Sequence, residues 1–238
     1  MQNILTIFKK ELSGYFNSAI AYIVIVVFLL LTGLWTWMLW SSIPAMGVVT
    51  MRPAFDIIPY TFLVLIPAIT MRSFSEEKKT GTIELLLTRP ITDMEIIVGK
   101  WLSALTLTLL AILPTIIYVI SLSFLGKLDW GSIICAYLGL IMLSGIFVGI
   151  GILCSSLTEN QIVAFIMSFL VILFLLLIKF ALAFVPASMA SVMEYLSVNY
   201  HYASISRGVI DTRDIIYYLS GITILLLLTR TALESRKW

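Results

Sequence analysis

Six long stretches of mostly apolar residues limit what this chain can fold into. They cover roughly residues 19–40, 55–71, 97–124, 131–157, 161–185 and 214–230. A helix needs about 20 such residues to cross a hydrocarbon core about 30 Å thick. Only 12% of the 238 residues are charged, whereas soluble domains have about 25%. We therefore predict an all-α membrane protein with six transmembrane helices in a single domain, residues 1–238.

The positions of lysine and arginine predict the orientation of these helices, because cytoplasmic loops carry an excess of both. With the N-terminus in the cytoplasm, ten of the 15 basic residues lie inside, namely Lys9, Lys10, Arg72, Lys78, Lys79, Arg89, Lys100, Arg230, Arg236 and Lys237. The five outside are Arg52, Lys127, Lys179, Arg207 and Arg213. The sequence thus predicts that both termini are cytoplasmic. Lys179 is expected to extend from the end of the fifth helix to the interface.

Amphipathic segments are predicted before the first span and before the sixth. Residues 1–18 place Lys9 and Lys10 opposite an apolar stripe, which indicates a cytoplasmic elbow helix in the plane of the interface. The stripe consists of Ile4, Leu5, Phe8, Leu12, Tyr15 and Phe16. Residues 186–213 form an outer segment rich in methionine and tyrosine. A helical face that rests on the membrane is suggested there by Met189, Val192, Met193 and Leu196.

Motifs that carry chemistry are almost absent. The sequence has no phosphate-binding GxxxxGK[ST] loop and no HExxH or GxSxG motif. Its spans are nearly free of charged residues, which argues against an ion-coupled transporter and a proton relay. The only histidine, His201, could be a metal ligand or a pH sensor, but without a partner at ligand spacing neither role is favoured. We predict a chain that is no enzyme, binds no metal or cofactor of its own and, with a net charge of +2, no nucleic acid.

Residues 72–96, between the second and third spans, are the polar exception. "EEKK" is expected to be solvated, and Gly81 to interrupt the helix that descends from the second span. Thr80 or Thr82 can then cap a short helix "IELLL", which Pro90 ends because the residue before proline avoids the α region. A capping box between Thr92 and Glu95 is expected to start the third span. We predict two short helices in a rigid cytoplasmic turn, either a docking element or an ordered connector; the resemblance given below implies that they are coupling helices.

The fourth span contains a small-residue face, Gly145 and Gly149, four residues apart. Such a pair lets two helix backbones approach closely. The pattern alone leaves two interpretations open. The glycines pack helices within one chain, or they form the seam between two subunits.

The polar segment also carries a family resemblance. "MRSFSEEKKTGTIELLLTRPITDMEIIVGKWLSAL" resembles the signature of type-two ABC exporter permeases. The matching positions are Glu77, Lys78, Gly81, Thr82, Glu84, Leu85, Leu86, Pro90, Gly99 and Lys100. The resemblance extends over essentially the whole chain and is greatest to the gliding-motility (GldF) branch of the family. A related branch serves the maturation of a copper enzyme.

This resemblance implies a permease subunit in a bacterial cytoplasmic membrane, coupled to separate ATPase subunits that bind ATP and Mg²⁺. A second permease, identical or different and possibly GldG-like, would complete the complex within the membrane lipid. The implied ATPase-docking residues are Glu76, Glu77, Lys78, Lys79, Gly81, Thr82, Glu84, Arg89 and Pro90, with Glu84 as the anchoring carboxylate. The complex would export a substrate or perform mechanical work, or the chain would act as a mechanotransmitter or assembly scaffold. Few polar residues are expected at the seam, namely Ser144, Ser155, Ser156 and Thr158, which favours an apolar or lipid-linked cargo, or none.

Overall fold

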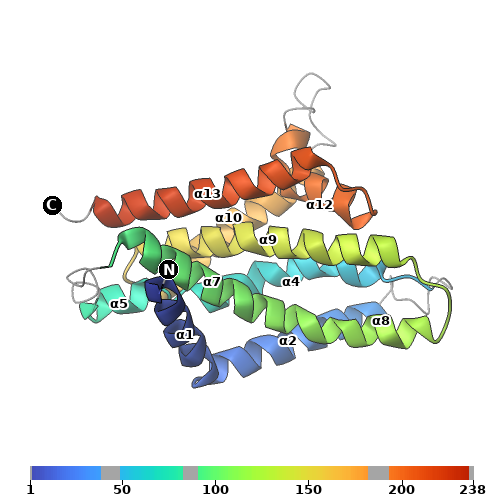
Figure 1. Cartoon of the computed structure of the whole chain (residues 1–238), viewed down its shortest axis with the longest axis horizontal. Helices are drawn as coiled ribbons and strands as arrows, with labels where there is room; N and C mark the ends of the chain where they lie inside the picture. Colours follow the sequence, from blue (N-terminus) through green and yellow to red (C-terminus); the bar gives the residue numbers. More distant parts are fainter. Residues whose placement is uncertain (1, 39–48, 83–90, 182–192, 236–238) are drawn as a thin grey trace.

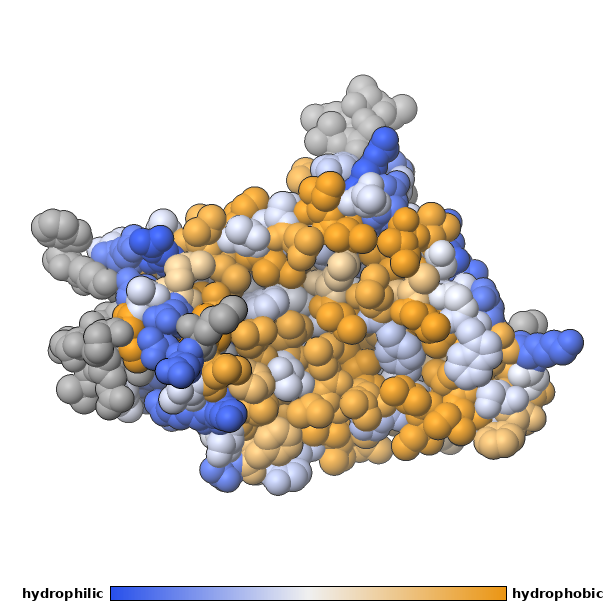
Figure 2. All heavy atoms as spheres, viewed as in Figure 1, coloured by the Kyte–Doolittle hydropathy of each residue, from blue (hydrophilic) through white to orange (hydrophobic). Residues whose placement is uncertain are grey.

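The computed structural model describes residues 2–38, 49–82, 91–181 and 193–235, and this part of the chain is helical without any strand. It contains six helical runs long and apolar enough to cross a membrane, Ala19–Trp37, Arg52–Lys79, Asp93–Ser123, Trp130–Leu157, Gln161–Phe180 and Thr212–Glu234. A broad apolar band lies between polar ends of the molecule (Figure 2). The predicted all-α membrane fold with six spans is confirmed.

The spans form one elongated bundle (Figure 1). In chain order the helices are α1 (Gln2–Phe16), α2 (Ala19–Trp37), α4 (Arg52–Thr70), α5 (Ser75–Lys79), α7 (Asp93–Ile112), η1 (Leu113–Thr115), α8 (Ile116–Ser123), α9 (Trp130–Leu157), α10 (Gln161–Ala181), α12 (Val198–Ser206) and α13 (Thr212–Glu234). Both chain ends lie at the same end of the bundle as α5, while α12 lies toward the opposite end (Figure 1). These two regions are called below the α5 end and the α12 end.

Helix α9 is the centre of the bundle, in contact with α4, α7, α10, α12 and α13. Its glycines allow this crowding. A Cβ atom on Gly151 would lie 2.0 Å from the Thr70 Oγ1 on α4, so the two backbones could not approach as they do with any larger residue. A Cβ atom on Gly145 would lie 2.8 Å from the Ile222 side chain, and one on Gly149 would lie 3.1 Å from the Leu225 side chain, both on α13. In the described chain these two glycines therefore pack helices of one subunit together.

Prolines shape two of the spans. Pro59, inside α4, has no N–H to donate to the carbonyl of Phe55, four residues earlier. The hydroxyl of Tyr202 on α12 donates to that carbonyl instead, at 3.0 Å, as expected where neighbouring helices satisfy freed backbone groups. In the third span, predicted as one helix, Pro114 lies in the short 3₁₀ turn η1 that separates α7 from α8. A proline is a frequent cause of such a break.

Helix α12 belongs to the predicted outer segment, and it packs into the bundle. Its buried side chains are Val198, Asn199, His201, Tyr202 and Ile205. Of the four residues predicted to rest on the membrane, Met189 and Val192 lie outside the described residues. Met193 is half-buried and Leu196 is exposed. That membrane-facing stripe therefore stays a prediction.

Candidate functional site

The polar connection at the α5 end begins with a fixed turn. Helix α4 ends at Thr70, and α5 starts at Ser75, so the backbone groups at both helix ends need partners. The buried Ser155 of α9 provides them. Its Oγ donates to the Met71 carbonyl at 3.0 Å and accepts from the N–H groups of Phe74 and Ser75 at 3.0 and 3.1 Å. The start of α5 is thereby attached to the central helix.

Helix α5 itself has an exposed face and an inward face. Glu76 and Lys79 are exposed, whereas Glu77 and Lys78 are half-buried. The ammonium of Lys78 donates to the carbonyl of Ser156, at the end of α9. The expectation that all of "EEKK" is solvated is therefore wrong for two of its four residues. A five-residue helix turns its side chains to opposite sides, and the inner side of α5 lies against α9 and α10 and contacts Lys100 of α7.

Lys100 of α7 is the hub of this region. Its side chain is only 2% exposed, and its Nζ donates to Glu77 Oε1 at 2.8 Å and to Glu11 Oε1 at 2.9 Å. The ammonium also lies 5.2 Å from the centroid of the Phe74 ring, within the range of a cation–π contact. A buried lysine is costly unless charges of opposite sign surround it. These contacts join α1, α5 and α7, and we call Lys100, Glu11 and Glu77 the ionic triad.

The elbow helix α1 packs directly on α7. Gly99 makes this possible, because a Cβ atom there would lie 2.8 Å from the Ile7 Cγ2. The Tyr15 hydroxyl donates to the Ile69 carbonyl of α4 at 3.2 Å, and burial raises the pKa of Tyr15, so this donor stays protonated. The inward face of α1 runs through Ile7, Glu11 and Tyr15, while Leu5 is 56% exposed. The predicted apolar stripe included Leu5 and omitted Ile7, and its contact with the membrane stays a prediction.

The predicted capping box is present at the start of α7. Thr92 Oγ1 accepts from the Glu95 N–H at 3.4 Å, and Glu95 Oε2 accepts from the Thr92 N–H at 3.1 Å. The Glu95 carboxylate also accepts from the Asn3 amide of α1 at 3.3 Å. The Glu95 side chain thus fixes the start of the third span and also binds the first turn of the elbow helix α1.

An open cleft of about 560 Å³ lies between α1 and α5. Its walls carry charges of both signs, from Lys10, Glu11, Arg72, Glu76 and Lys100 among others. Thr80 and Thr82 also line it, on either side of Gly81, whose φ of 71° ends the helix. Gly81 thus follows the end of α5, whereas the helix of the second span already ends at Thr70, earlier than predicted.

The predicted site residues thus fall into separate groups. Glu76, Lys79, Gly81 and Thr82 are exposed together at one end of the molecule. Glu84, Arg89 and Pro90 lie outside the described residues. Glu77 and Lys78 face the bundle. Lys100 and Glu11, which complete the triad, were not predicted as site residues.

The serines expected at a subunit seam are placed differently. Ser144, Ser155 and Ser156 are fully buried within the chain. Ser144 donates to the Ile141 carbonyl and Ser156 to that of Leu153, while Ser155 holds the turn before α5. They therefore line no surface that a partner or cargo can reach, and this expectation is wrong for these three residues.

Comparison with known families settles the class of protein. Residues 5–230 match the family model for the ABC-2 family transporter protein. The chain belongs to this family. No curated protein matches it. As an ABC-2 family member the chain is a membrane subunit that lacks ATPase activity of its own, and the family implies a cytoplasmic ABC ATPase partner and dimerisation.

Proposed function

We propose that the α5 end is the cytoplasmic end of this permease subunit, where a separate ATPase subunit docks and transmits movement to the spans. The observation that carries the proposal is the ionic triad. Lys100 on a span simultaneously holds Glu77 of α5 and Glu11 of the elbow helix. A short helix joined by buried charges to two other helices cannot shift alone.

The orientation rests on the basic residues and on the course of the chain. Both termini lie at the α5 end (Figure 1), the side to which the sequence assigns ten of 15 lysines and arginines. The excess of positive charge is typical of the cytoplasmic side. We infer a multi-pass protein of the bacterial cytoplasmic membrane with both termini inside.

The exposed face of α5 and the turn after it are the proposed docking surface. Glu76, Lys79, Gly81 and Thr82 are accessible to a partner, and Glu84, Arg89 and Pro90 follow them in the sequence. A displacement of α5 would reach α9 through Ser155, and α1 and α7 through the triad. Since α9 contacts five helices besides α5, the movement would spread to most of the bundle.

The resemblance to the gliding-motility branch supports mechanical work, in a complex with a GldG-like second permease, as the use of this movement. Export is the other use. The burial of Ser144, Ser155 and Ser156 removes the polar residues expected along a transport seam. This favours an apolar or lipid-linked cargo, or a mechanotransmitter without cargo. Nothing in the contacts favours the copper-enzyme branch.

Charge reversal on the exposed face of α5 tests the docking proposal. The chain is co-expressed with its ATPase, and co-purification and ATP turnover are measured. Glu76→Lys combined with Lys79→Glu should abolish co-purification, because it inverts the surface without touching the triad. Glu234→Lys is the matched control, an exposed glutamate on α13 at the same end, and should bind the ATPase normally. Normal binding and turnover by the double variant would exclude α5 as the docking site.

A further inference from the structure

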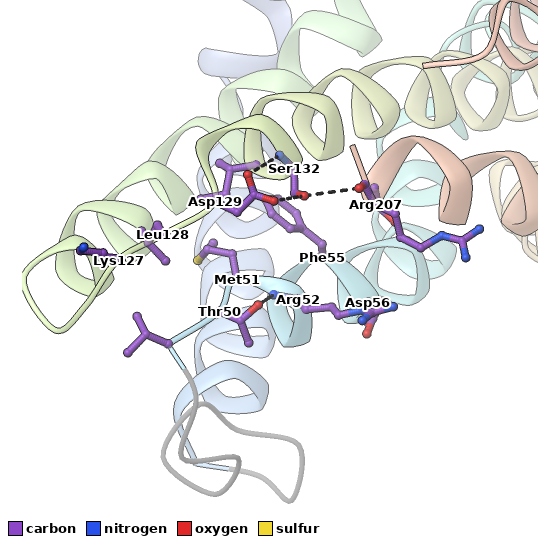
Figure 3. Close-up of a pocket in the computed structure, with 13 residues that line it drawn as sticks. Thr50, Met51, Arg52, Phe55, Asp56, Lys127, Leu128, Asp129, Ser132 and Arg207 are labelled. Atoms are coloured by element: carbon purple, nitrogen blue, oxygen red, sulfur yellow. Dashed lines mark hydrogen bonds between the residues drawn. The ribbon is translucent and has the colours of Figure 1, made fainter. Parts of the chain in front are cut away.

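A second polar cleft lies toward the α12 end of the bundle. It has a volume of about 410 Å³ and is lined by Arg52, Lys179 and Arg207, which belong to α4, the last turn of α10 and the end of α12. A neighbouring cleft of about 330 Å³ shares Arg52, Asp56 and Arg207 with it (Figure 3). Three helices that are distant in sequence thus bring basic side chains to one place.

These cations have few negative partners. Among the described residues, Asp56 is the one carboxylate that lines the cleft of about 410 Å³. Although Asp56 follows Arg52 by one helical turn, the two form no ion pair. Within the described part of the chain, neither Lys179 nor Arg207 forms an ion pair either. The three charged side chains are exposed. A cleft with an excess of one sign of charge concentrates ions of the opposite sign.

The carboxylate of the neighbouring cleft is already engaged. Asp129 accepts from Ser132 Oγ at 2.6 Å and from the N–H groups of Gly131 and Ser132 at the start of α9. These hydrogen bonds lower the pKa of Asp129 and direct its charge toward that helix start. In Figure 3 the side chains of Arg52 and Arg207 extend away from Lys127 and Asp129, toward the side of Asp56. Asp129 therefore does not neutralise the positive charge of the cleft of about 410 Å³.

The floor of the cleft is held in place by buried hydrogen bonds. Tyr202 of α12 donates to the Phe55 carbonyl of α4 at 3.0 Å, and Asn199 of α12 donates to the Leu176 carbonyl of α10 at 3.2 Å. Burial raises the pKa of Tyr202 well above its usual range, so it remains a donor. The backbone of Arg207 is fixed with α12, and its Nε donates to the Ala203 carbonyl at 3.0 Å. The cations are thus presented by helices whose relative positions are set.

The cleft adjoins the end of a predicted span. Lys179 comes at the end of a span, next to Leu177 and Phe180, which are 47% and 55% exposed. Apolar surface for acyl chains and basic side chains for a headgroup therefore adjoin. An amphiphile with a negatively charged head matches this arrangement better than a fully soluble anion or a neutral lipid.

We propose that Arg52, Lys179 and Arg207 form a binding site for a phosphate group with net negative charge, as carried by an anionic phospholipid headgroup. Guanidinium and ammonium groups bind phosphate oxygens through charge-assisted hydrogen bonds. The site is independent of the ATPase dock, because it shares no residue with the α5 end. It goes beyond the proposed coupling function and holds whether or not a cargo is moved.

Lipid competition tests the site. The full-length protein is purified in a zwitterionic detergent and offered equal amounts of phosphatidylglycerol and phosphatidylcholine, and bound lipid is measured by native mass spectrometry. Wild type should retain phosphatidylglycerol preferentially. Lys179→Gln with Arg207→Gln should weaken that retention roughly tenfold or more, because two charge-assisted contacts are lost. Arg213→Gln is the matched control, an exposed arginine near the same end that does not line the cleft, and should behave as wild type.

A variant that should bind the lipid more tightly separates the effect on binding from a loss of folding. Asp56→Asn removes the one carboxylate of the cleft and should tighten phosphatidylglycerol binding. Inorganic phosphate is added in a parallel series. If it raises the melting temperature of wild type and not of the double variant, the site is supported with soluble phosphate as its source. The proposal is overturned if the double variant retains phosphatidylglycerol as wild type does, or if Asp56→Asn leaves retention unchanged or weakens it.

Discussion

At the α5 end a short helix is held to the bundle by buried charges, whereas at the α12 end a short helix is held mainly by hydroxyl and amide donors. Lys100 connects α5 to α1 and α7 through two carboxylates. Tyr202, Asn199 and Tyr218 instead connect α12 to α4, α10 and α13, each through one hydrogen bond that involves a backbone carbonyl. The link from α5 to α1 and α7 depends on one side chain, whereas the links of α12 are spread over several.

The α12 end also contains a buried contact between two titratable side chains, His201 and Asp214. Their Nδ1 and Oδ1 atoms lie 2.6 Å apart, and His201 Nε2 lies 2.9 Å from the Tyr195 carbonyl. Since a carbonyl can only accept, Nε2 is the donor in the contact with Tyr195. The imidazole stacks on Tyr217 with 4.0 Å between ring centroids. The expectation of a histidine without a partner missed Asp214.

The difference indicates which end is built to transmit movement. Removing one partner of a buried ion pair costs about 3–5 kcal/mol, whereas a typical hydrogen bond contributes about 1 kcal/mol. A displacement of α5 is thus firmly linked to α1 and α7 through a single lysine. Helix α12, with several smaller links to three spans, is fixed in place.

The largest effect should come from Lys100→Met. It leaves Glu11 and Glu77 facing each other without a cation, so we expect the free energy of unfolding to fall by about 3–5 kcal/mol. Reversible unfolding in mixed micelles with increasing SDS measures this. Adding Glu11→Gln and Glu77→Gln should restore most of the loss, since no charge then lacks a partner. Wild-type stability of the single variant would refute the triad as a structural link.

A smaller effect is expected from Tyr202→Phe. The Phe55 carbonyl, freed by Pro59, would lose its donor, at a cost of about 1–2 kcal/mol, measured by the same unfolding assay. Phe keeps the ring and its packing. Tyr22→Phe, at an exposed tyrosine of α2, is the control and should have no effect. If Tyr202→Phe destabilises the protein as much as Lys100→Met, the contrast between the two ends does not hold.

Features with local signals could be predicted from the sequence. The six spans follow from runs of apolar residues, the helix end before Gly81 from its backbone freedom, and the capping box from residues three apart. The triad could not be predicted, because Lys100 lies 89 residues from Glu11 and 23 from Glu77. One signal was present: Glu11 falls between Ile7 and Tyr15 at spacings of four, a carboxylate in the middle of the buried face of α1.

The sequence only partly distinguishes residues on the exposed docking surface from residues that face the bundle. Charge alone does not distinguish Glu76, which is exposed, from Glu77, which faces Lys100. The seam serines were misassigned for a related reason, since Ser144 and Ser156 hydrogen-bond the backbone of their own helix. Which side of a helix faces the bundle is decided by packing, and the pattern of residue types does not record it.

The central claim, that the triad makes α5 and the elbow helix move together, is tested by pulsed EPR. Spin labels are placed at Lys9 on α1 and at Thr80 after α5, both exposed, in the complex with its ATPase. In the wild-type background the distance between the labels should stay the same when ATP binds. In the variant with Lys100→Met, Glu11→Gln and Glu77→Gln it should change, because α5 then follows the ATPase alone. An ATP-dependent change in the wild-type background, or none in the triad variant, would contradict the account.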